Sequence, residues 1–327
     1  MLAYLLRRLL YGALILLGVN LLTFVLFFAV NTPDDMARLA LGGKRVTTES
    51  IEAWKSAHGY DVPLFWNDEA EGSGKWTETV FWRRSAPLLV LDFGMSESGR
   101  DITTEIRSRM VPSLLLAVPT FLLGVLAVVS WSLLLVLFRR TRLEAGAIAF
   151  SVVLMSISGL FYIIAGQWLF GKVMRLVPVS GWNDGWASVA FLVLPVAIGV
   201  FSQLGSGTLL YRAMFLEEMN KDYVRCVRAK GLSETRVLFG HVLRNASLPI
   251  VTSTVAVIPS LFMGSLIMES FFGIPGLGSY TIDAVNAQDF SVVRAMVFLG
   301  TIAYIVGLIL TDIVYTWVDP RIRLTNR

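Results

Sequence analysis

The sequence predicts an all-α integral membrane protein with about six transmembrane helices. Its 327 residues are 55% hydrophobic and only 16% charged, whereas a soluble domain usually carries about 25% charged residues. The mean hydropathy is +0.66. Apolar runs of roughly 20 residues, long enough to cross a bilayer, recur between polar segments. These observations predict several spans and one modest domain outside the membrane.

The first expected span follows Arg7 and Arg8 directly. Its apolar core is longer than that of a cleaved signal peptide, and no small-x-small cleavage site is visible. We therefore expect an uncleaved span with a cytoplasmic amino terminus. The six apolar runs that predict spans are Leu9–Val30, Val111–Phe138, Ala145–Phe170, Ser188–Leu210, Leu248–Met268 and Val292–Trp317.

The longest polar segment follows the first span and mixes both charge signs with many aromatic residues. It is too aromatic for a disordered linker, so we expect a small folded periplasmic domain. Its arginines do not contradict that side, because long loops are exempt from the positive-inside rule. The expected organisation is a first helix at 1–30, a periplasmic domain at 31–110, and a five-helix core at 111–327.

Prolines and basic clusters mark the middle spans. Pro119 lies inside the second span and predicts a kink or a break. The cluster Arg139-Arg140-Thr141-Arg142 closes that span and marks the cytoplasmic side. Pro195 lies inside the fourth span, and Pro249 is expected in the first turn of the fifth.

The fifth span ends at Glu269, and F-F-G-I-P-G-L-G follows at 271–278. This glycine-rich string lacks G-K-[ST] and a preceding strand, so it predicts turn-and-helix packing rather than a phosphate loop. Glu269 has two open interpretations. It could pair with Arg294, or it could face a substrate cavity.

The polar segment 212–247 separates the fourth and fifth spans, and its cations outnumber its acids. It predicts two short helices. The expected apolar side of the first is Met219, Tyr223, Cys226 and Val227, and that of the second is Val237, Leu238, His241 and Val242. Gly231 after Lys230 predicts a helix end with a left-handed residue, and Ser233 can cap the second helix. Such a hairpin could lie on lipid headgroups or dock into a partner.

The identities of the residues in this segment are more specific than its hydrophobic periodicity. D-Y-V-R-x-x-R-A-K-G-L at 222–232, followed by H-V-L-R-N-A at 241–246, resembles the cytoplasmic coupling loop of binding-protein-dependent ABC importer permeases, dipeptide/oligopeptide/nickel class. Val227 stands where that family usually has a smaller residue. The resemblance implies contact with an ATP-hydrolysing subunit through Asp222, Tyr223, Arg225, Arg228, Ala229, Lys230, Gly231 and Leu232.

The resemblance also implies a setting in the bacterial cytoplasmic membrane and a set of partners. These are a second permease subunit, two ATP-binding subunits, a periplasmic substrate-binding protein and membrane lipid. No cofactor is expected in this chain, and ATP and Mg²⁺ are expected in the partner ATPases. Peptides are the expected cargo, with nickel or another small solute as alternatives. The carboxyl terminus is expected in the cytoplasm.

Other chemistry is absent from the sequence. The chain has no G-x-x-x-x-G-K-[ST] and no G-x-S-x-G nucleophile elbow. Two scattered histidines and one cysteine, Cys226, give no metal-binding spacing, and Cys226 is expected to be a small buried residue. No nucleic-acid-binding signature is present. A transport subunit without enzymatic activity is therefore expected; the rivals are a secondary transporter and a membrane enzyme.

Overall fold

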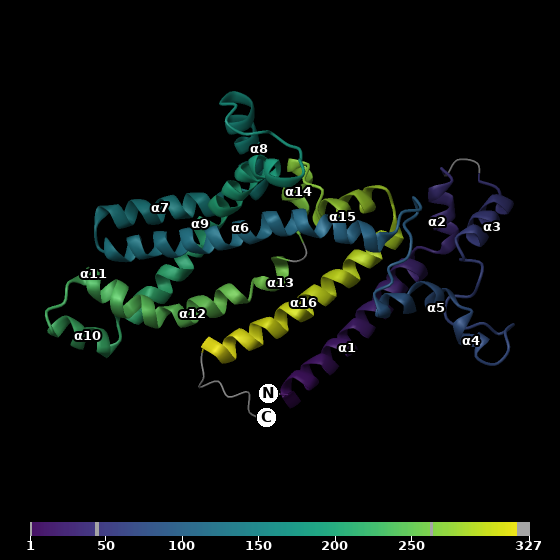
Figure 1. The fold of residues 1–327 in the computed structure, drawn as a ribbon, viewed down its shortest axis with the longest axis horizontal. Helices are drawn as coiled ribbons and strands as arrows, with labels where there is room; N and C mark the ends of the chain where they lie inside the picture. Colours follow the sequence, from purple (N-terminus) through teal and green to yellow (C-terminus); the bar gives the residue numbers. More distant parts are fainter. Residues whose placement is uncertain (1, 43–45, 262–263, 319–327) are drawn as a thin grey trace. The chain divides into compact units, whose positions relative to one another are not determined.

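The computed structural model describes residues 2–42, 46–261 and 264–318, and it is drawn in Figure 1. Within these ranges the regular structure is helical, and the chain forms no β-strand beyond one isolated bridge between Met95 and Asp101. The expected carboxyl-terminal segment after Val318 lies outside the described residues. The predicted all-α class is confirmed.

Four long helices are apolar enough to cross a membrane. They are α1 (Leu2–Val25, continued by the π-turn Leu26–Val30), α6 (Ile102–Leu137), α9 (Ser188–Met219) and α16 (Phe290–Val318). Their apolar stretches cover 23 to 36 residues, which at 1.5 Å per residue exceeds the thickness of a bilayer core of about 30 Å. The first, second, fourth and sixth predicted spans are confirmed.

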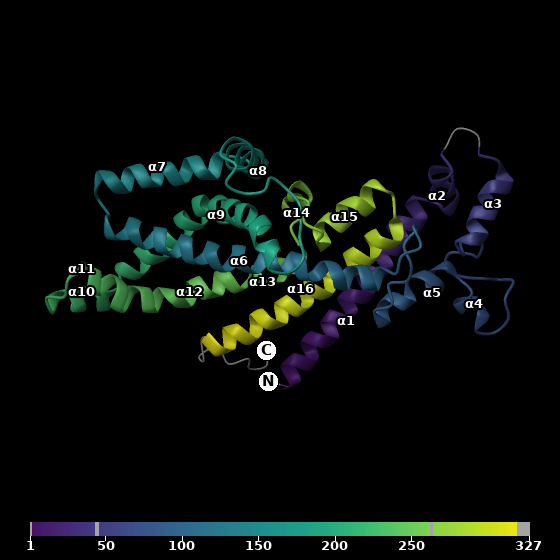
Figure 2. The same cartoon turned by 45° about the horizontal axis from the view of Figure 1, so that its top comes forward.

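The third predicted span, Ala145–Phe170, is not one straight helix. α7 (Arg142–Ser156) and the pair α8 (Gly159–Gly166) and η3 (Gln167–Val173) meet at an angle of 92°, and Figure 2 shows the change of direction. Ile157 and Ser158 both have extended backbones at the bend. Serine and glycine have low helix propensity, so the sequence Ser156-Ile157-Ser158-Gly159 does little to favour continuation of the helix through the bend.

The fifth predicted span, Leu248–Met268, also differs from one helix. α12 (Leu243–Val255) ends before α13 (Ile258–Leu261), and α14 (Leu266–Phe272) follows. Pro259 lies in the first turn of α13, where its missing N–H cannot extend the hydrogen-bond ladder of α12. If each bent pair counts as one span, the described residues contain six spans; otherwise they contain four.

The prolines of the predicted spans lie inside helices, and one of them is not where we expected it. α6 runs through Pro112 and Pro119 without a break, and α9 runs through Pro195. Pro249 was expected in a first turn, but it lies in the interior of α12. That expectation was wrong because the helix starts well before the apolar run, in the polar segment.

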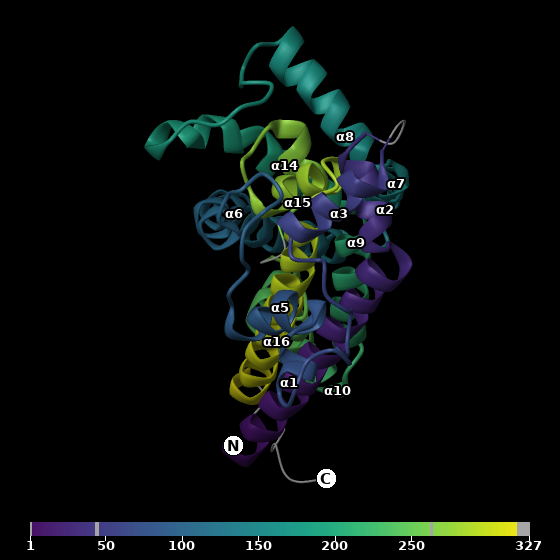
Figure 3. The ribbon, with the colours of Figure 1, turned by 90° about the vertical axis from the view of Figure 1, so that its right-hand side faces the viewer.

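The chain divides into two compact units. The first contains residues 1–107 and 283–302. In it the short helices α2 (Pro33–Ala40), α3 (Thr48–Ala57), α4 (Gly74–Thr77) and α5 (Val80–Arg84) follow α1. Figure 3 shows α2 and α3 side by side. Aromatic and apolar side chains from several of these segments, α1 and its π-turn included, form a core of Phe24, Phe28, Met36, Tyr60 and Val80.

The second unit contains residues 108–282 and 303–327. α7, α8 and α12 all pack on α9 in this unit. The short helices α10 (Asp222–Ala229) and α11 (Glu234–Val237), with the π-turn η5 (Leu238–Val242), connect α9 to α12 (Figure 1). Residues 277–282, the first part of α15 (Leu277–Asn286), also belong to this unit.

Glu269 is fully buried in the second unit, and hydrogen bonds from residues around it in the fold hold its side chain. Its carboxylate accepts hydrogen bonds from the Ser113 hydroxyl at 2.8 Å and from the backbone amide of Gly278 at 2.7 Å. The amides of Ser265 and Ser279 donate to it as well, each at 3.1 Å. These four donors give Glu269 a structural role, as one of the two sequence interpretations held, but through partners other than the Arg294 that it named. The glycine-rich string 271–278 is the expected turn between helices.

Candidate functional site

The helix α10 has the position and the end that the sequence predicts. Lys230 is its C-cap, and the next residue, Gly231, has a φ of +80°. The Gly231 amide donates to the Arg228 carbonyl at 2.9 Å. A Cβ placed on Gly231 would meet nothing within 4 Å. The glycine is therefore needed for its left-handed backbone and not for lack of space.

The second short helix begins where the sequence predicts, with one difference. Ser233 is the N-cap of α11 and has an extended backbone, but its side chain accepts no capping hydrogen bond. The helix continues as η5, and the chain then enters α12. The predicted hairpin of helix, glycine turn and helix is therefore confirmed in the described residues. Ser233 occupies the N-cap position, but its side chain does not cap the helix.

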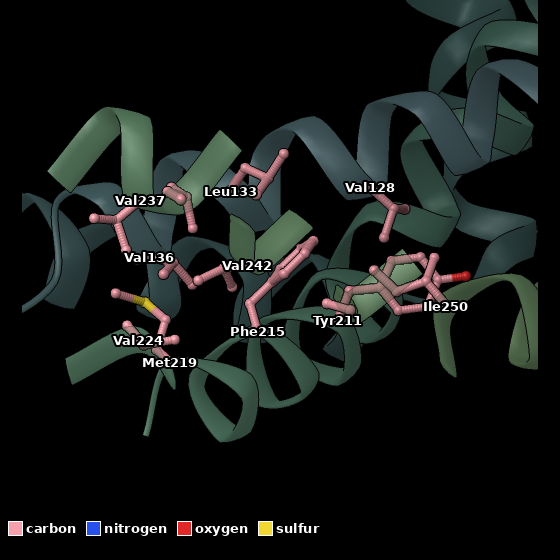
Figure 4. Packing of buried hydrophobic residues seen from close by; sticks show 12 residues of the cluster. Val128, Leu133, Val136, Tyr211, Phe215, Met219, Val224, Val237, Val242 and Ile250 are labelled. Carbon is pink, nitrogen blue, oxygen red and sulfur yellow. The ribbon is translucent and has the colours of Figure 1, made fainter. Parts of the chain in front are cut away.

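The hairpin packs through its apolar side onto the second unit's own helices. Val224, Val237 and Val242 are completely buried, and Leu238 is nearly so. Figure 4 shows Val224, Val237 and Val242 close to side chains from α6 and α9, and Leu238 belongs to the same cluster. The cluster comprises Val128, Leu133, Val136, Tyr211, Phe215, Met219, Val224, Val237, Leu238, Val242, Ala246 and Ile250.

The sequence assigned part of this apolar side incorrectly. Met219, Val237, Leu238 and Val242 are buried as expected, and Tyr223 and Val227 are partly buried against the cluster. Cys226 and His241 are exposed instead. The periodicity was counted from Met219, but α10 begins only at Asp222. Counting from Asp222 would have brought out Val224 and Val227 at i and i+3.

The candidate contact residues divide into an outward set and an anchoring set. The outward set is exposed and consists of Asp222, Arg225, Ala229, Lys230 and Gly231. The anchoring set is half-buried and consists of Tyr223, Arg228 and Leu232. The side chains of Asp222 and Arg225 are 94% and 75% exposed, so their ion pair at 3.5 Å contributes little to stability. The outward set therefore forms a polar surface that contributes little to the stability of this chain.

Two acids fix the hairpin in place. Glu218 is buried at the end of α9 and accepts from the Tyr223 hydroxyl at 2.9 Å and from Lys221. Burial raises the pKa of the Tyr223 hydroxyl, and the hydrogen bond from Lys221 to Glu218 raises the pKa of Lys221. At neutral pH both groups therefore keep the protons that they donate to Glu218.

Glu234 joins the two short helices. Its two carboxylate oxygens accept from Arg228 Nε at 2.7 Å and from Arg228 Nη2 at 3.2 Å. This bidentate geometry is the strong form of an arginine–carboxylate pair. Arg139, in the turn after α6, lies 3.9 Å from the same carboxylate. Arg228 is thus positioned across the glycine turn, and its guanidinium is already engaged.

Comparison with known proteins identifies the family. Residues 100–324 match the family described as "Binding-protein-dependent transport system inner membrane component". Residues 1–85 match "Binding-prot-dependent transport system membrane comp, N-term". The chain belongs to this permease family. It is a multi-pass inner-membrane protein and the permease subunit of an ABC importer.

Full-length relatives agree with the family match. The permease is 29% identical to the oligopeptide transport system permease protein AppB of Bacillus subtilis (strain 168), over 98% of this chain and 99% of the relative. It is 30% identical to the glutathione transport system permease protein GsiC of Salmonella paratyphi A, and 29% identical to GsiC of Escherichia coli (strain K12). Each GsiC alignment covers 99% of both chains.

Proposed function

We propose that this permease imports peptides and that segment 212–247 receives the motion of partner ATPases. The cargo is inferred from the relatives, whose names specify oligopeptides and glutathione. Nickel or another small solute remains the alternative cargo. The permease would pair with a second permease subunit and accept substrate from a periplasmic binding protein. Two ATP-binding subunits, holding ATP and Mg²⁺, would supply the free energy.

The observation that carries the coupling proposal is the two-sided structure of the hairpin. Its apolar side is buried against α6 and α9, so it is not available for the lipid surface that an interfacial hairpin would need. Its polar side, with Asp222, Arg225 and Lys230, faces outward. A short helix fixed to a core on one side and exposed on the other can transmit a push from a bound partner to the spans.

Coupling of this kind has a thermodynamic requirement. A partner shifts an equilibrium between two conformations only if it binds them with different affinities. Movement of α10 by closing ATPases would meet this requirement, because Val224 and Glu218 tie α10 to the end of α9. By the positive-inside rule, the arginines at 139–142 and the basic hairpin favour a cytoplasmic position for both segments, and we include that position in the proposal. The two termini would share that side, and residues 31–110 would lie in the periplasm.

Reconstitution tests the proposal. The assembled transporter in proteoliposomes should take up a radiolabelled peptide only when ATP and the ATP-binding subunits are present. Nickel uptake measured in parallel distinguishes the alternative cargo. Peptide uptake driven by an ion gradient, with no ATP-binding subunit present, would contradict the proposal and favour a secondary transporter.

A further inference from the structure

A basic turn between α6 and α7 is not explained by the coupling role. Arg139, Arg140 and Arg142 fall within four residues, at the end of a membrane-spanning helix. Arg139 lies near Glu234. Arg140 and Arg142 are exposed, and in the described part of the chain no ion pair holds either side chain. Two guanidinium groups are therefore free to bind an anion at the membrane surface.

An apolar cavity adjoins this turn. It has a volume of about 220 Å³. Its lining from α6 and the residue after it includes Trp131, Leu134 and Phe138, and α7 contributes Leu143 and Ala147. Phe138 and Leu143 directly flank the four-residue turn, so the cavity and the arginines share one place in the fold. A cavity of about 150 Å³ holds a benzene molecule, so this one holds several methylene groups.

The carboxylate in the cavity lining does not oppose an anion. Glu144 Oε1 accepts from the Arg212 guanidinium, with Arg212 Nε at 3.2 Å. Glu144 Oε2 accepts from the backbone amide of Arg140. Because Arg212 balances the charge of Glu144, the local excess is positive and comes from the turn.

We propose that this turn and cavity bind an anionic phospholipid. The phosphate would lie on Arg140 and Arg142, and part of one acyl chain would occupy the cavity. The charge of the site decides the occupant. Juxtamembrane arginines attract anionic lipids on the cytoplasmic side. A zwitterionic lipid carries no net charge, because its headgroup cation cancels its phosphate, and an apolar helix of a partner would leave both guanidinium groups unpaired.

Native mass spectrometry of the assembled transporter, titrated with phosphatidylglycerol or phosphatidylcholine, tests the site. Replacing both arginines (Arg140→Gln with Arg142→Gln) should lower the affinity for phosphatidylglycerol by about 30-fold, with phosphatidylcholine binding unchanged. The matched control is Lys172→Gln with Arg175→Gln, which removes two exposed cations near the end of η3 and should change neither affinity. Equal phosphatidylglycerol binding by wild type and the Arg140/Arg142 variant would overturn the proposal.

A second variant tests the cavity while keeping every charge. Ala147→Phe fills the cavity, so it should also reduce bound phosphatidylglycerol, and this test remains valid if the double glutamine variant fails to assemble. Millimolar inorganic phosphate should not displace the lipid, because it cannot occupy the apolar part. Unchanged lipid binding in Ala147→Phe, or complete displacement by phosphate, would show that the site is not a phospholipid site.

Discussion

At the scale of single residues, Gly231 shows most clearly how one backbone conformation shapes the hairpin. Its φ of +80° is a region that other residues enter at a cost of roughly 1–2 kcal/mol. No neighbouring atom opposes a side chain there. A substitution at this position therefore tests the backbone alone, separately from packing.

Gly231→Ala should lower ATP-driven uptake by about 5- to 30-fold, because that factor corresponds to a conformational cost of roughly 1–2 kcal/mol in the docked geometry. Uptake in proteoliposomes measures this. Gly146→Ala is the control, since Gly146 lies in helical backbone in α7 with open space around it. Wild-type uptake by the Gly231 variant would show that the turn does not matter for coupling.

Glu269 is a residue whose role depends on hydrogen-bond donors from the turns around it and from Ser113 in α6. Glu269→Gln keeps its size but turns one acceptor into an N–H₂ group facing the amides of Gly278 and Ser279. The loss of stability should be about 1–3 kcal/mol, measured by thermal unfolding in detergent. The exposed Glu217→Gln should leave the melting temperature unchanged. Equal melting temperatures for all three proteins would mean that the buried carboxylate is dispensable.

At the scale of elements, one side of α10 is buried against the core of the second unit and the other side is exposed. Val224 is its completely buried residue, and Cys226 lies exposed on the same helix. The pair offers a matched comparison of an anchor and a surface position.

Val224→Ala removes two buried methyl groups and should weaken docking of α10 by about 2 kcal/mol. The amides of α10 should then exchange with deuterium about 30-fold faster, as local opening becomes more frequent. Cys226→Ala should leave the exchange rate unchanged. Equal exchange in wild type and the Val224 variant would indicate that α10 is held by its ion pairs instead.

The positions of the membrane spans could be predicted from the sequence better than the breaks within them. Spans of continuous apolar character, such as α6 and α9, were predicted well, because length and hydropathy determine them. The bend at Ile157-Ser158 was missed, since every residue around it is apolar or small enough for a membrane helix. Pro119 lies in a helix that runs on without a break, so of the expected kink or break the break is absent, whereas Pro259, at an actual break, gave no stronger signal.

The location of the hairpin and of its turn could be predicted from the sequence, but which residues of its first helix are buried could not. The motif at 222–232 located the hairpin, and Gly231 located its turn. The buried position Val224 was missed because the helix starts after a turn at Asn220 and Lys221. The bonds of Glu218 and Glu269 were not foreseeable, because each depends on which donors the folded chain brings near.

At the scale of the whole molecule, this permease has hydrophobic spans and, in our proposal, no source of energy of its own. The work of transport would enter through the hairpin and pass to α9 and α12, which the hairpin connects. The cytoplasmic position of the hairpin is essential to this scheme.

The position of Cys226 can be determined directly, because it is the chain's only cysteine and is exposed. A thiol reagent that cannot cross the membrane should label it in inverted vesicles and not in intact cells. The Cys226→Ala variant controls for labelling of other subunits. Labelling in intact cells would contradict the proposed topology and the coupling role together.

The most direct measurement of the coupling proposal is a cross-link from Cys226 in the assembled transporter. A photoactivatable group attached to this thiol should capture an ATP-binding subunit, and the yield should change between ATP-bound and nucleotide-free states. Capture of lipid alone, with no ATP-binding subunit in either state, would contradict the claim that this hairpin receives the motion of the ATPases.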